Sequence, residues 1–267
     1  MMIKKYTTLL KAGVMEMLHF RLSVLVLVAG NMLYLAVIYF LWKAIFDSAG
    51  TESVNGMTFE STLIYLVLAT ALFNFMEMYI VWDMGRTIQS GKIVLDLIKP
   101  MDYKNYMFWA FSGNVAAQFF TTFLPTFIVV ALVTKGAIPL GTNLIAFAVS
   151  VILGIVINFN VDFIVGTICL YTESIWGINI MKQVIVLLFS GATIPLAFFP
   201  EGLRRVVDLL PFRAIYDAPL TILLSINGIT DDVLYTIAIQ IVWVIILEIL
   251  SRGFWKISLR QITVNGG

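Results

Sequence analysis

The stretch WDMGRTIQSGKIVLDLIKPMDYK, residues 82–104, decides how the chain is organised. It is polar, carries Lys and Arg, and lies between two long apolar runs, so we expect it in water at a membrane surface. Ser90 is placed to cap a short helix that has an apolar edge, and Pro100 disfavours the α conformation at the residue before it. The pattern suits a helix that docks into a groove on another protein, and it equally suits a loop along lipid headgroups.

The composition is that of a membrane protein. Of the 267 residues, 60% are hydrophobic and 12% are charged, whereas a soluble domain carries roughly 25% charged residues. A formal net charge of +1 gives no argument for a nucleic-acid partner. The single cysteine, Cys169, permits no internal disulfide and is interpreted as a small packing residue.

Six apolar runs predict six membrane-spanning helices in a single transmembrane domain, residues 1–267. Each run is near the ~20 residues that cross a hydrocarbon core of ~30 Å. The runs cover approximately residues 22–42, 61–82, 107–134, 143–170, 178–198 and 232–251. Because backbone amides cannot stay unpaired in lipid, the expected fold class is an all-α polytopic membrane protein.

Residues 1–21 predict an amphipathic helix that precedes the first span. Its apolar side is formed by Ile3, Tyr6, Leu10 and Met17, and its polar side by Lys4, Lys5, Thr8, Lys11, Glu16 and His19. Such a helix is expected to lie in the plane of the membrane interface as an elbow, or to pack on a partner. His19, the only histidine, is interpreted as a surface residue on the polar side.

The distribution of Lys and Arg predicts the orientation of the chain. With the amino terminus inside, the inner segments hold Lys4, Lys5, Lys11, Arg21, Arg86, Lys92, Lys99, Lys104, Lys182, Arg252, Lys256 and Arg260. The outer segments hold Lys43, Lys135, Arg204, Arg205 and Arg213. This excess inside predicts that both termini are cytoplasmic and that residues 83–106 form a cytoplasmic loop.

The segment between the fifth and sixth runs departs from this pattern. Its sequence, TIPLAFFPEGLRRVVDLLPFRAIYDAPLTILL at residues 193–224, is too apolar for a free loop, and its prolines leave room only for short helices such as 201–210. We expect residues 199–230 to hold short helices that enter the outer leaflet and return. Candidate outer-gate residues are Pro195, Phe199, Pro200, Pro211 and Phe212. The alternative is an interfacial helix that serves packing alone.

Polar stripes on three spans are candidates for a translocation path. The fourth span carries Asn158, Asp162, Gly166, Cys169 and Glu173 on one helical face. The second carries Thr70, Asn74 and Glu77, and the third carries Asn114, Gln118 and Thr122. A carboxylate deep in a span is costly, so Asp162 should face the protein interior or a water-filled path. The same stripes would also arise from hydrogen bonds that only hold helices together.

Enzyme signatures are sparse in this sequence. One histidine and one cysteine are too few for the usual zinc or thiol sites, and the motifs G-x-S-x-G and H-E-x-x-H do not occur. The dipeptide Gly91-Lys92 lacks the flanking residues of a nucleotide-binding loop. We therefore expect no metal, cofactor or ATP on this chain.

Six motifs in order along the chain carry a family resemblance. They are KKY...LK at residues 4–11, FLWKAIF at 40–46, I-Q-S-G-K-I-x-x-x-L-I-K-P at 88–100, TESIWGINI at 172–180, SGATIPLAFFPEGLRRVVDLLPF at 190–212 and the terminal Asn-Gly-Gly. With these motifs and the six-span layout, the chain resembles the permease subunits of ABC-2 type transporters over essentially its whole length. Within that family it is similar to the bacterial subgroup in which two related permeases are encoded with one ATPase.

The resemblance implies half of the translocation path of an ATP-driven exporter in a bacterial cytoplasmic membrane. ATP and Mg would be bound by a separate ABC ATPase, present in two copies, and a second permease would be a sister chain more readily than this chain again. The first cytoplasmic loop would be a coupling helix in a cleft of the ATPase; by position that role falls on Ser90, Gly91, Lys92, Ile93, Leu95, Leu97 and Pro100. The segment after Pro195 would form re-entrant outer helices that cap the exit.

Two other functions stay open from the residues alone. A membrane-embedded lipid-modifying enzyme would use Asp162 and Glu173, and it would turn over a lipid without any ATPase. A membrane scaffold or assembly subunit would use the polar stripes only to hold helices together, and it would retain no ATP-binding partner.

Overall fold

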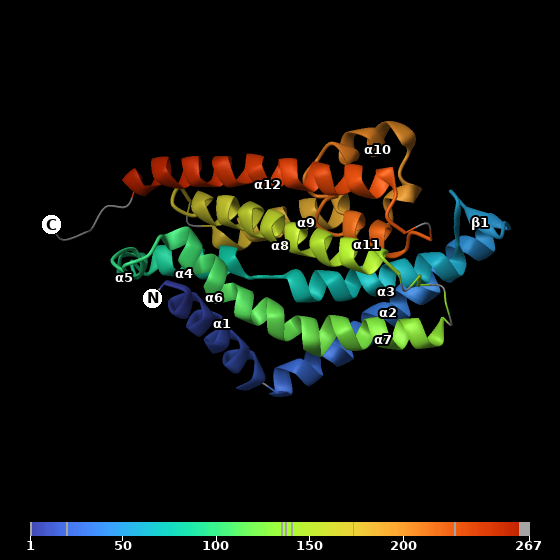
Figure 1. Ribbon diagram of the computed structural model, residues 1–267, viewed down its shortest axis with the longest axis horizontal. Coiled ribbons are helices and arrows are strands. Elements are labelled where there is room, and N and C mark those ends of the chain that lie inside the picture. Colours follow the sequence, from blue (N-terminus) through green and yellow to red (C-terminus); the bar gives the residue numbers. More distant parts are fainter. Residues whose placement is uncertain are drawn as a thin grey trace.

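Long helices that run in a common direction make up most of the chain (Figure 1). This computed structural model describes residues 2–19, 21–134, 136, 138–139, 141–172, 174–226 and 228–261. Within these residues, five helical stretches are long and apolar enough to cross a membrane: 29–49, 59–89, 103–133, 143–168 and 231–261. A sixth apolar helix, α9 (Ile175–Phe189), has only 15 residues.

The amino-terminal helix α1 (Met2–His19) and α2 (Arg21–Ala49) meet in a V at the lower edge of Figure 1. A helix is therefore present where residues 1–21 predict one, and its role as an interfacial elbow stays a prediction. α1 lies along α6 (Tyr103–Gln118), and the two backbones come close at Gly13 and Gly113. A Cβ added at Gly113 would overlap the carbonyl oxygen of Leu10, so only glycine fits there. α2 continues to Ala49, well beyond the predicted end near residue 42.

A two-stranded hairpin joins α2 to the next helix. Strands β1 (Ser53–Val54) and β2 (Met57–Thr58) pair in antiparallel fashion across Asn55 and Gly56, which both have positive φ. Asn-Gly is the dipeptide that favours this tight turn. Thr58 then begins α3 (Phe59–Met76) with a capping box: it accepts from the Ser61 amide, and Ser61 accepts in return.

The second span is longer than predicted and interrupted. After α3, the chain breaks at residues 77–79 and continues as α4 (Ile80–Gln89). The expected loop from residue 83 is therefore helical up to Gln89, and the expectation was wrong on this point. The reason is tertiary packing: Met84 lies against Gly166 and Gly85 against Ile175, so one face of α4 is covered by α8 (Asn143–Ile168) and α9.

The third span is continuous from α6 to α7 (Leu124–Val133) through a π-helical turn, Phe119–Phe123. Pro125 lies in the first turn of α7. Proline has no backbone N–H to donate, and a wider turn before it lets the helix pass this position.

The fifth predicted span, 178–198, is shorter in the structure. α9 ends at Phe189, and the chain turns at Ser190 and Gly191, where φ is 78°. Residues 196–198 form only one 3-10 turn, Leu196–Phe198. The apolar run continued past the turn, and hydropathy alone did not separate the helix from the turn that follows it.

Short helices and the last long helix complete the bundle. α10 (Glu201–Asp208) and α11 (Asp217–Leu223) precede α12 (Asp231–Ser258), which ends in a 3-10 turn, Leu259–Gln261. In Figure 1, α5 (Ile93–Leu97) lies at the left end, while β1, α10 and α11 lie toward the right. The core runs along α3 and α8: the apolar window of the α3–α4 stretch is 72% buried and that of α8 is 56%, against 17% for the other three spans.

Candidate functional site

The interruption of the second span lies in the interior of the bundle. α3 ends at Met76, and Tyr79 takes a left-handed φ of 53° just before α4 begins. A helix end leaves carbonyl groups without intrahelical partners. Asn158 of α8 satisfies one of them, because its Nδ2 donates to the Met76 carbonyl at 3.0 Å and both residues are buried. A side chain of the neighbouring helix thus holds the break in place.

Three charged side chains meet beside this break, and we call them the buried triad: Glu77, Asp162 and Lys182. Lys182 Nζ lies 2.9 Å from Asp162 Oδ1 and 3.7 Å from Glu77 Oε1. The exposed fraction of the side chain is 4% for Lys182, 0% for Asp162 and 9% for Glu77. Three separate elements, α9, α8 and the break, therefore contribute to one charged cluster inside an apolar bundle.

The triad was only partly predictable. Asn158 and Asp162 lie on one face of α8, as their spacing predicts, and that face is buried within this chain. In this conformation they contact other parts of the same protein instead of an open path. Lys182 was wrongly counted among the inner surface charges. Its neighbour one turn earlier, Asn179, is buried as well, and two polar residues three apart in an apolar run were the available signal.

The remaining path candidates, Asn74, Asn114 and Gln118, are not members of the triad. Glu77 does not extend the helical stripe of Thr70 and Asn74, because α3 ends before it. Asn74, Asn114 and Gln118 are half-buried. Among the described residues, no hydrogen bond or ion pair joins these three to the triad. Glu173 lies outside the residues that the structure describes.

A second polar cluster ties three spans together. Lys104, at the start of α6, is 2% exposed and its Nζ lies 2.7 Å from Asn160 Oδ1, 2.6 Å from Glu248 Oε2 and 2.6 Å from Ser251 Oγ. These partners lie on α8 and α12. All three ammonium protons of Lys104 have an acceptor, so this cluster is satisfied and has a structural role. The sequence pattern predicts Lys104 in a cytoplasmic loop, and this burial was not predicted.

Ion pairs hold the segment after α10 together, and a hydrogen bond joins it to α3. Arg213 Nη1 lies 3.0 Å from Asp208 Oδ1, and its Nε donates to Asp217 Oδ2 at 3.0 Å. Asp217 Oδ1 accepts from the Tyr65 hydroxyl of α3 at 3.0 Å. Burial lowers the pKa of Arg213, but Asp217 and Asp208 outweigh that effect and raise it, so the guanidinium stays charged. Gly191 gives the room that this contact needs, because a Cβ there would lie 2.6 Å from the Tyr65 hydroxyl.

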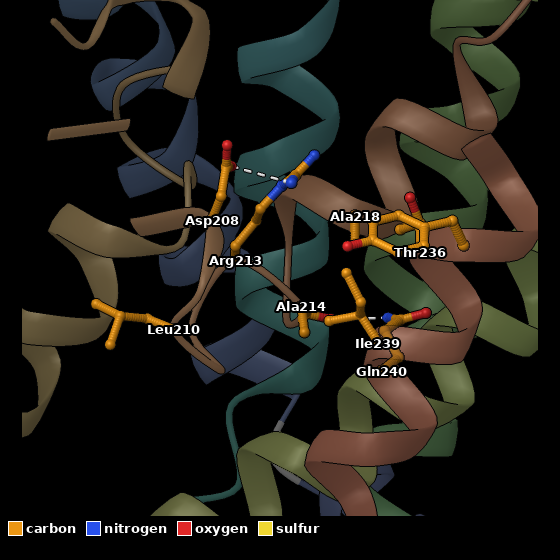
Figure 2. Close-up of a pocket in the computed structure, with 9 residues that line it drawn as sticks. Asp208, Leu210, Arg213, Ala214, Ala218, Thr236, Ile239 and Gln240 are labelled. Carbon is orange, nitrogen blue, oxygen red and sulfur yellow. Dashed lines mark hydrogen bonds and ion pairs between the residues drawn. The ribbon is translucent and has the colours of Figure 1, made fainter. Parts of the chain in front are cut away.

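A small groove lies between this segment and α12 (Figure 2). Figure 2 shows Arg213 directed toward Asp208 on one side and Gln240 reaching the Ala214 carbonyl on the other, at 2.8 Å. The groove is lined by Asp208, Leu210, Arg213, Ala214, Ala218, Tyr235, Thr236, Ile239 and Gln240. The Arg213–Asp208 ion pair forms part of one wall, so the contacts that hold this segment in place also shape the groove.

The predicted outer-gate residues mark turns in this segment. Pro195 precedes the 3-10 turn, Pro200 precedes α10, and Pro211 follows the end of α10. Pro195 and Pro211 are buried, Phe199 and Phe212 are half-buried, and Pro200 is exposed. The prolines therefore divide the segment into short helices, as expected, and α10 is two residues shorter than the predicted 201–210.

The α4–α5 hairpin, residues 80–100, carries the predicted coupling residues. Ser90 does not cap α5: its hydroxyl donates to the Arg86 carbonyl at 2.8 Å and ends α4, while Gly91 makes the turn with a φ of 68°. Ile93 is 2% exposed and anchors the hairpin to the core, so it is not available to a partner. The exposed apolar side chains are instead Leu95, at 62%, and Ile98, at 73%.

The remaining predicted positions of the hairpin differ in exposure. Lys92 and Pro100 are exposed, and Leu97 is half-buried. Lys99 Nζ lies 2.6 Å from Asp96 Oδ1 and 3.8 Å from the centre of the Tyr106 ring. Burial lowers the pKa of Lys99, but its hydrogen bonds to Asp96 and Tyr106 outweigh burial and raise the pKa. The hairpin is thus a fixed structure that presents two apolar side chains.

Comparison with known proteins gives one clear result. The family described as "ABC-2 family transporter protein" matches residues 32–266, which is nearly the whole chain. A comparison with curated proteins found no significant match. Apolar helices long enough to cross a membrane agree with a multi-pass membrane transporter. The chain therefore belongs to the ABC-2 family of transporter proteins, as a membrane-spanning permease.

Proposed function

We propose that this permease forms half of the translocation path of an exporter and that a separate ABC ATPase drives it. ABC-2 permeases generally work with such an ATPase, and this sequence has no nucleotide-binding loop of its own. The complete transporter would hold two ATPase subunits, which bind ATP and Mg, and a second permease that is a sister chain. Its place would be a bacterial cytoplasmic membrane, with both termini in the cytoplasm.

The exposed apolar pair formed by Leu95 of α5 and Ile98, which directly follows α5, is the observation that carries the proposal. Leu95 and Ile98 are more exposed than the half-buried residues between them, Asp96 and Leu97, and they lie at the end of the bundle where α5 is found (Figure 1). A short helix with an exposed apolar edge is suited to a groove on a protein partner. Ile93 packs into the core of the bundle and so anchors the hairpin that carries this edge. We infer that the ATPase cleft receives this edge.

The path of mechanical coupling would run through α4. This helix begins at the break beside the buried triad and ends at the turn before α5, over 10 residues or about 15 Å. It packs on α8 and α9 by close contacts at Gly85 and Gly166. A displacement of α5 by the ATPase would therefore move α4 as a rigid element and change the angle at the break. Residues at the ends of helical segments can act as hinges, because they absorb changes in φ and ψ.

The outer segment and the half-buried polar residues would complete the path. Residues 199–230 would form the re-entrant outer part, with Pro195, Phe199 and Phe212 at the exit. Asn74, Asn114 and Gln118 are partly open on this chain, and they would line the path where a second permease closes it. The substrate would be a lipid-like, peptide or drug-like molecule.

The test is the double substitution Leu95→Asp with Ile98→Asp. Both side chains are exposed, so the change should leave insertion and folding intact while placing two carboxylates against the apolar groove of a partner. We expect recovery of an ATP-hydrolysing subunit on purification in mild detergent to fall at least tenfold, with loss of ATP-dependent transport.

The matched control is Leu203→Asp with Val206→Asp on α10, at 43% and 57% exposure. It makes the same chemical change at the opposite part of the bundle and should leave ATPase recovery unchanged. Normal ATPase recovery in the α5 variant would rule out this docking surface. A permease that turned over a lipid without any ATPase would instead support an enzyme.

A further inference from the structure

The buried triad has an imbalance of charge. It holds two carboxylates, Glu77 and Asp162, and a single ammonium group, Lys182, all of them at least nine-tenths buried. If both carboxylates were ionised, the cluster would carry one net negative charge away from water. Burial of an uncompensated charge is strongly unfavourable, and proteins avoid it by taking up or releasing a proton.

A buried oxygen atom without a hydrogen-bond partner also indicates that the charge of the triad is not balanced. Asp162 Oδ2 is buried and, within the described part of the chain, has no hydrogen-bond partner. A metal ion is a poor fit as compensation, because Lys182 Nζ already lies 2.9 Å from Asp162 and would repel it. The described residues contain no group of three His, Cys, Asp or Glu side chains that would hold a metal ion. A proton needs no coordination shell, so it can neutralise one carboxylate without further ligands.

We propose that the buried triad is a proton-binding site, in which the two carboxylates hold one proton at neutral pH. Lys182 lies nearer to Asp162 than to Glu77, 2.9 Å against 3.7 Å, so the ion pair is Lys182–Asp162 and the proton resides on Glu77. Glu77 is also the most exposed member of the triad, which gives the proton a way in and out. This inference goes beyond transport driven by an ATPase and does not depend on it.

The groups around the triad leave this balance unchanged. Tyr79 follows Glu77 in the break and is half exposed, and Tyr216, at the start of α11, is buried within the field of both carboxylates. Both are phenols, which are neutral at physiological pH. From α8, Asn158 contributes only a neutral amide, and its donor is used by the Met76 carbonyl. Among the residues that the structure describes, Lys182 is therefore the one positive charge that faces the two carboxylates.

The position of Glu77 links the proton to the hinge. Glu77 is the first residue after α3, and its backbone is extended. A neutral Glu77 is compatible with the enclosed break seen here, whereas an ionised Glu77 requires water or a closer approach to Lys182. Movement of α4 that opens the break would therefore release the proton, and closing would bind it. The site would make the hinge sensitive to pH, whatever drives α4.

The test compares folding equilibrium constants of the full chain by reversible unfolding in mixed micelles, between about pH 6 and pH 8. A native state that holds one more proton than the unfolded state loses stability about tenfold per pH unit as pH rises. Glu77→Gln mimics the protonated side chain and removes this loss. We expect the ratio of its equilibrium constant to that of the wild type to rise about tenfold per pH unit. Asp162→Asn frees Lys182 to pair with Glu77, and it should show the same rise.

Two further variants fix the stoichiometry. Glu60→Gln removes an exposed carboxylate from α3, the helix that precedes Glu77. The ratio of its folding equilibrium constant to that of the wild type should therefore stay constant with pH. Lys182→Gln leaves the two carboxylates without a positive partner, so the native state needs a second proton. The ratio of its folding equilibrium constant to that of the wild type should therefore fall about tenfold for each unit by which the pH rises. A flat ratio for Glu77→Gln, like that of Glu60→Gln, would overturn the proposal.

Infrared spectroscopy gives a readout that needs no unfolding. The wild type at neutral pH should show the carbonyl band of a protonated carboxylic acid, and this band should vanish in Glu77→Gln but persist in Glu60→Gln. Absence of the band in the wild type would overturn the proposal. Stability of the wild type that depends on sodium concentration, with no dependence on pH, would also overturn it in favour of a bound sodium ion.

Discussion

Two glycines set how closely α1 approaches α6. Gly113 lies where a Cβ would overlap the Leu10 carbonyl oxygen, and Gly13 lies opposite it. Small residues at a helix crossing let two backbones come into contact, which is a common way to associate helices in membranes. The amino-terminal helix is therefore held against α6 by close backbone contact.

Gly113→Ala should destabilise the protein, because the backbone of α1 cannot yield as a flexible side chain would. We expect a loss of about 1–3 kcal/mol, typical of overpacking, measured by reversible unfolding in mixed micelles. Gly30→Ala is the matched control, since a Cβ at Gly30 meets nothing within 4 Å. That variant should be neutral or slightly stabilising, because alanine favours a helix over glycine. Equal effects of the two substitutions would contradict the close crossing.

Single charged residues were the least predictable feature of the candidate site. Lys104 and Lys182 were both taken as surface charges, and the structure buries both in polar clusters. Counting charges by loop assumes that each lysine near a helix end reaches water. Whether it does depends on which residues of other helices lie beside it, and a single sequence does not contain that information. Asp162, deeper in its span, was predictable as inward-facing because no water is near it.

The break between α3 and α4 is the element on which the proposed coupling depends. Tyr79 is a non-glycine residue with a left-handed φ of 53°, and its side chain is 49% exposed. For an L-residue with a Cβ, this backbone conformation costs about 1–2 kcal/mol. The surrounding contacts, such as the Asn158–Met76 hydrogen bond, hold the break against this strain.

Tyr79→Gly should therefore be more stable than Tyr79→Ala, by about 1 kcal/mol. Both variants lose the same half-exposed ring, and only glycine also relieves the left-handed strain, so their difference isolates the backbone. Reversible unfolding of the two proteins side by side measures it. An alanine variant as stable as the glycine variant would mean that the break is not strained in solution.

Elements were predictable where local pattern decides them. The apolar runs gave the helices α2, α3, α8 and α12, and the prolines gave the division of residues 195–219 into short helices. The helix α4 was missed because residues 83–89 are polar by local composition, and their helix depends on contacts such as Met84 with Gly166. The end of α9 was missed because Gly191 lies within a run that is otherwise apolar.

At the scale of the whole molecule, the two ends of the bundle differ in chemistry. The α5 end presents Arg86, Lys92 and Lys256 to water, whereas the other end holds the β-hairpin and the segment with α10 and α11 (Figure 1). Removing the buried residues Lys104 and Lys182 from the inner count of twelve leaves ten inner positive residues against five outer ones. The excess still favours the α5 end in the cytoplasm. One of the five, Lys135, lies outside the described residues.

Cysteine labelling tests this orientation directly, and the chain suits it because Cys169 is the single cysteine and only 3% exposed. In a Cys169→Ala background, Leu95→Cys places a thiol on α5 and Leu203→Cys places one on α10. A membrane-impermeant maleimide added to intact cells should label the α10 thiol and reach the α5 thiol only after permeabilisation. The reverse pattern would show that the chain has the opposite orientation, in which α5 could not contact a cytoplasmic ATPase. The proposed coupling of α5 through α4 requires that the bundle crosses the membrane along its long axis. Labelling of both thiols from one side would mean that it does not.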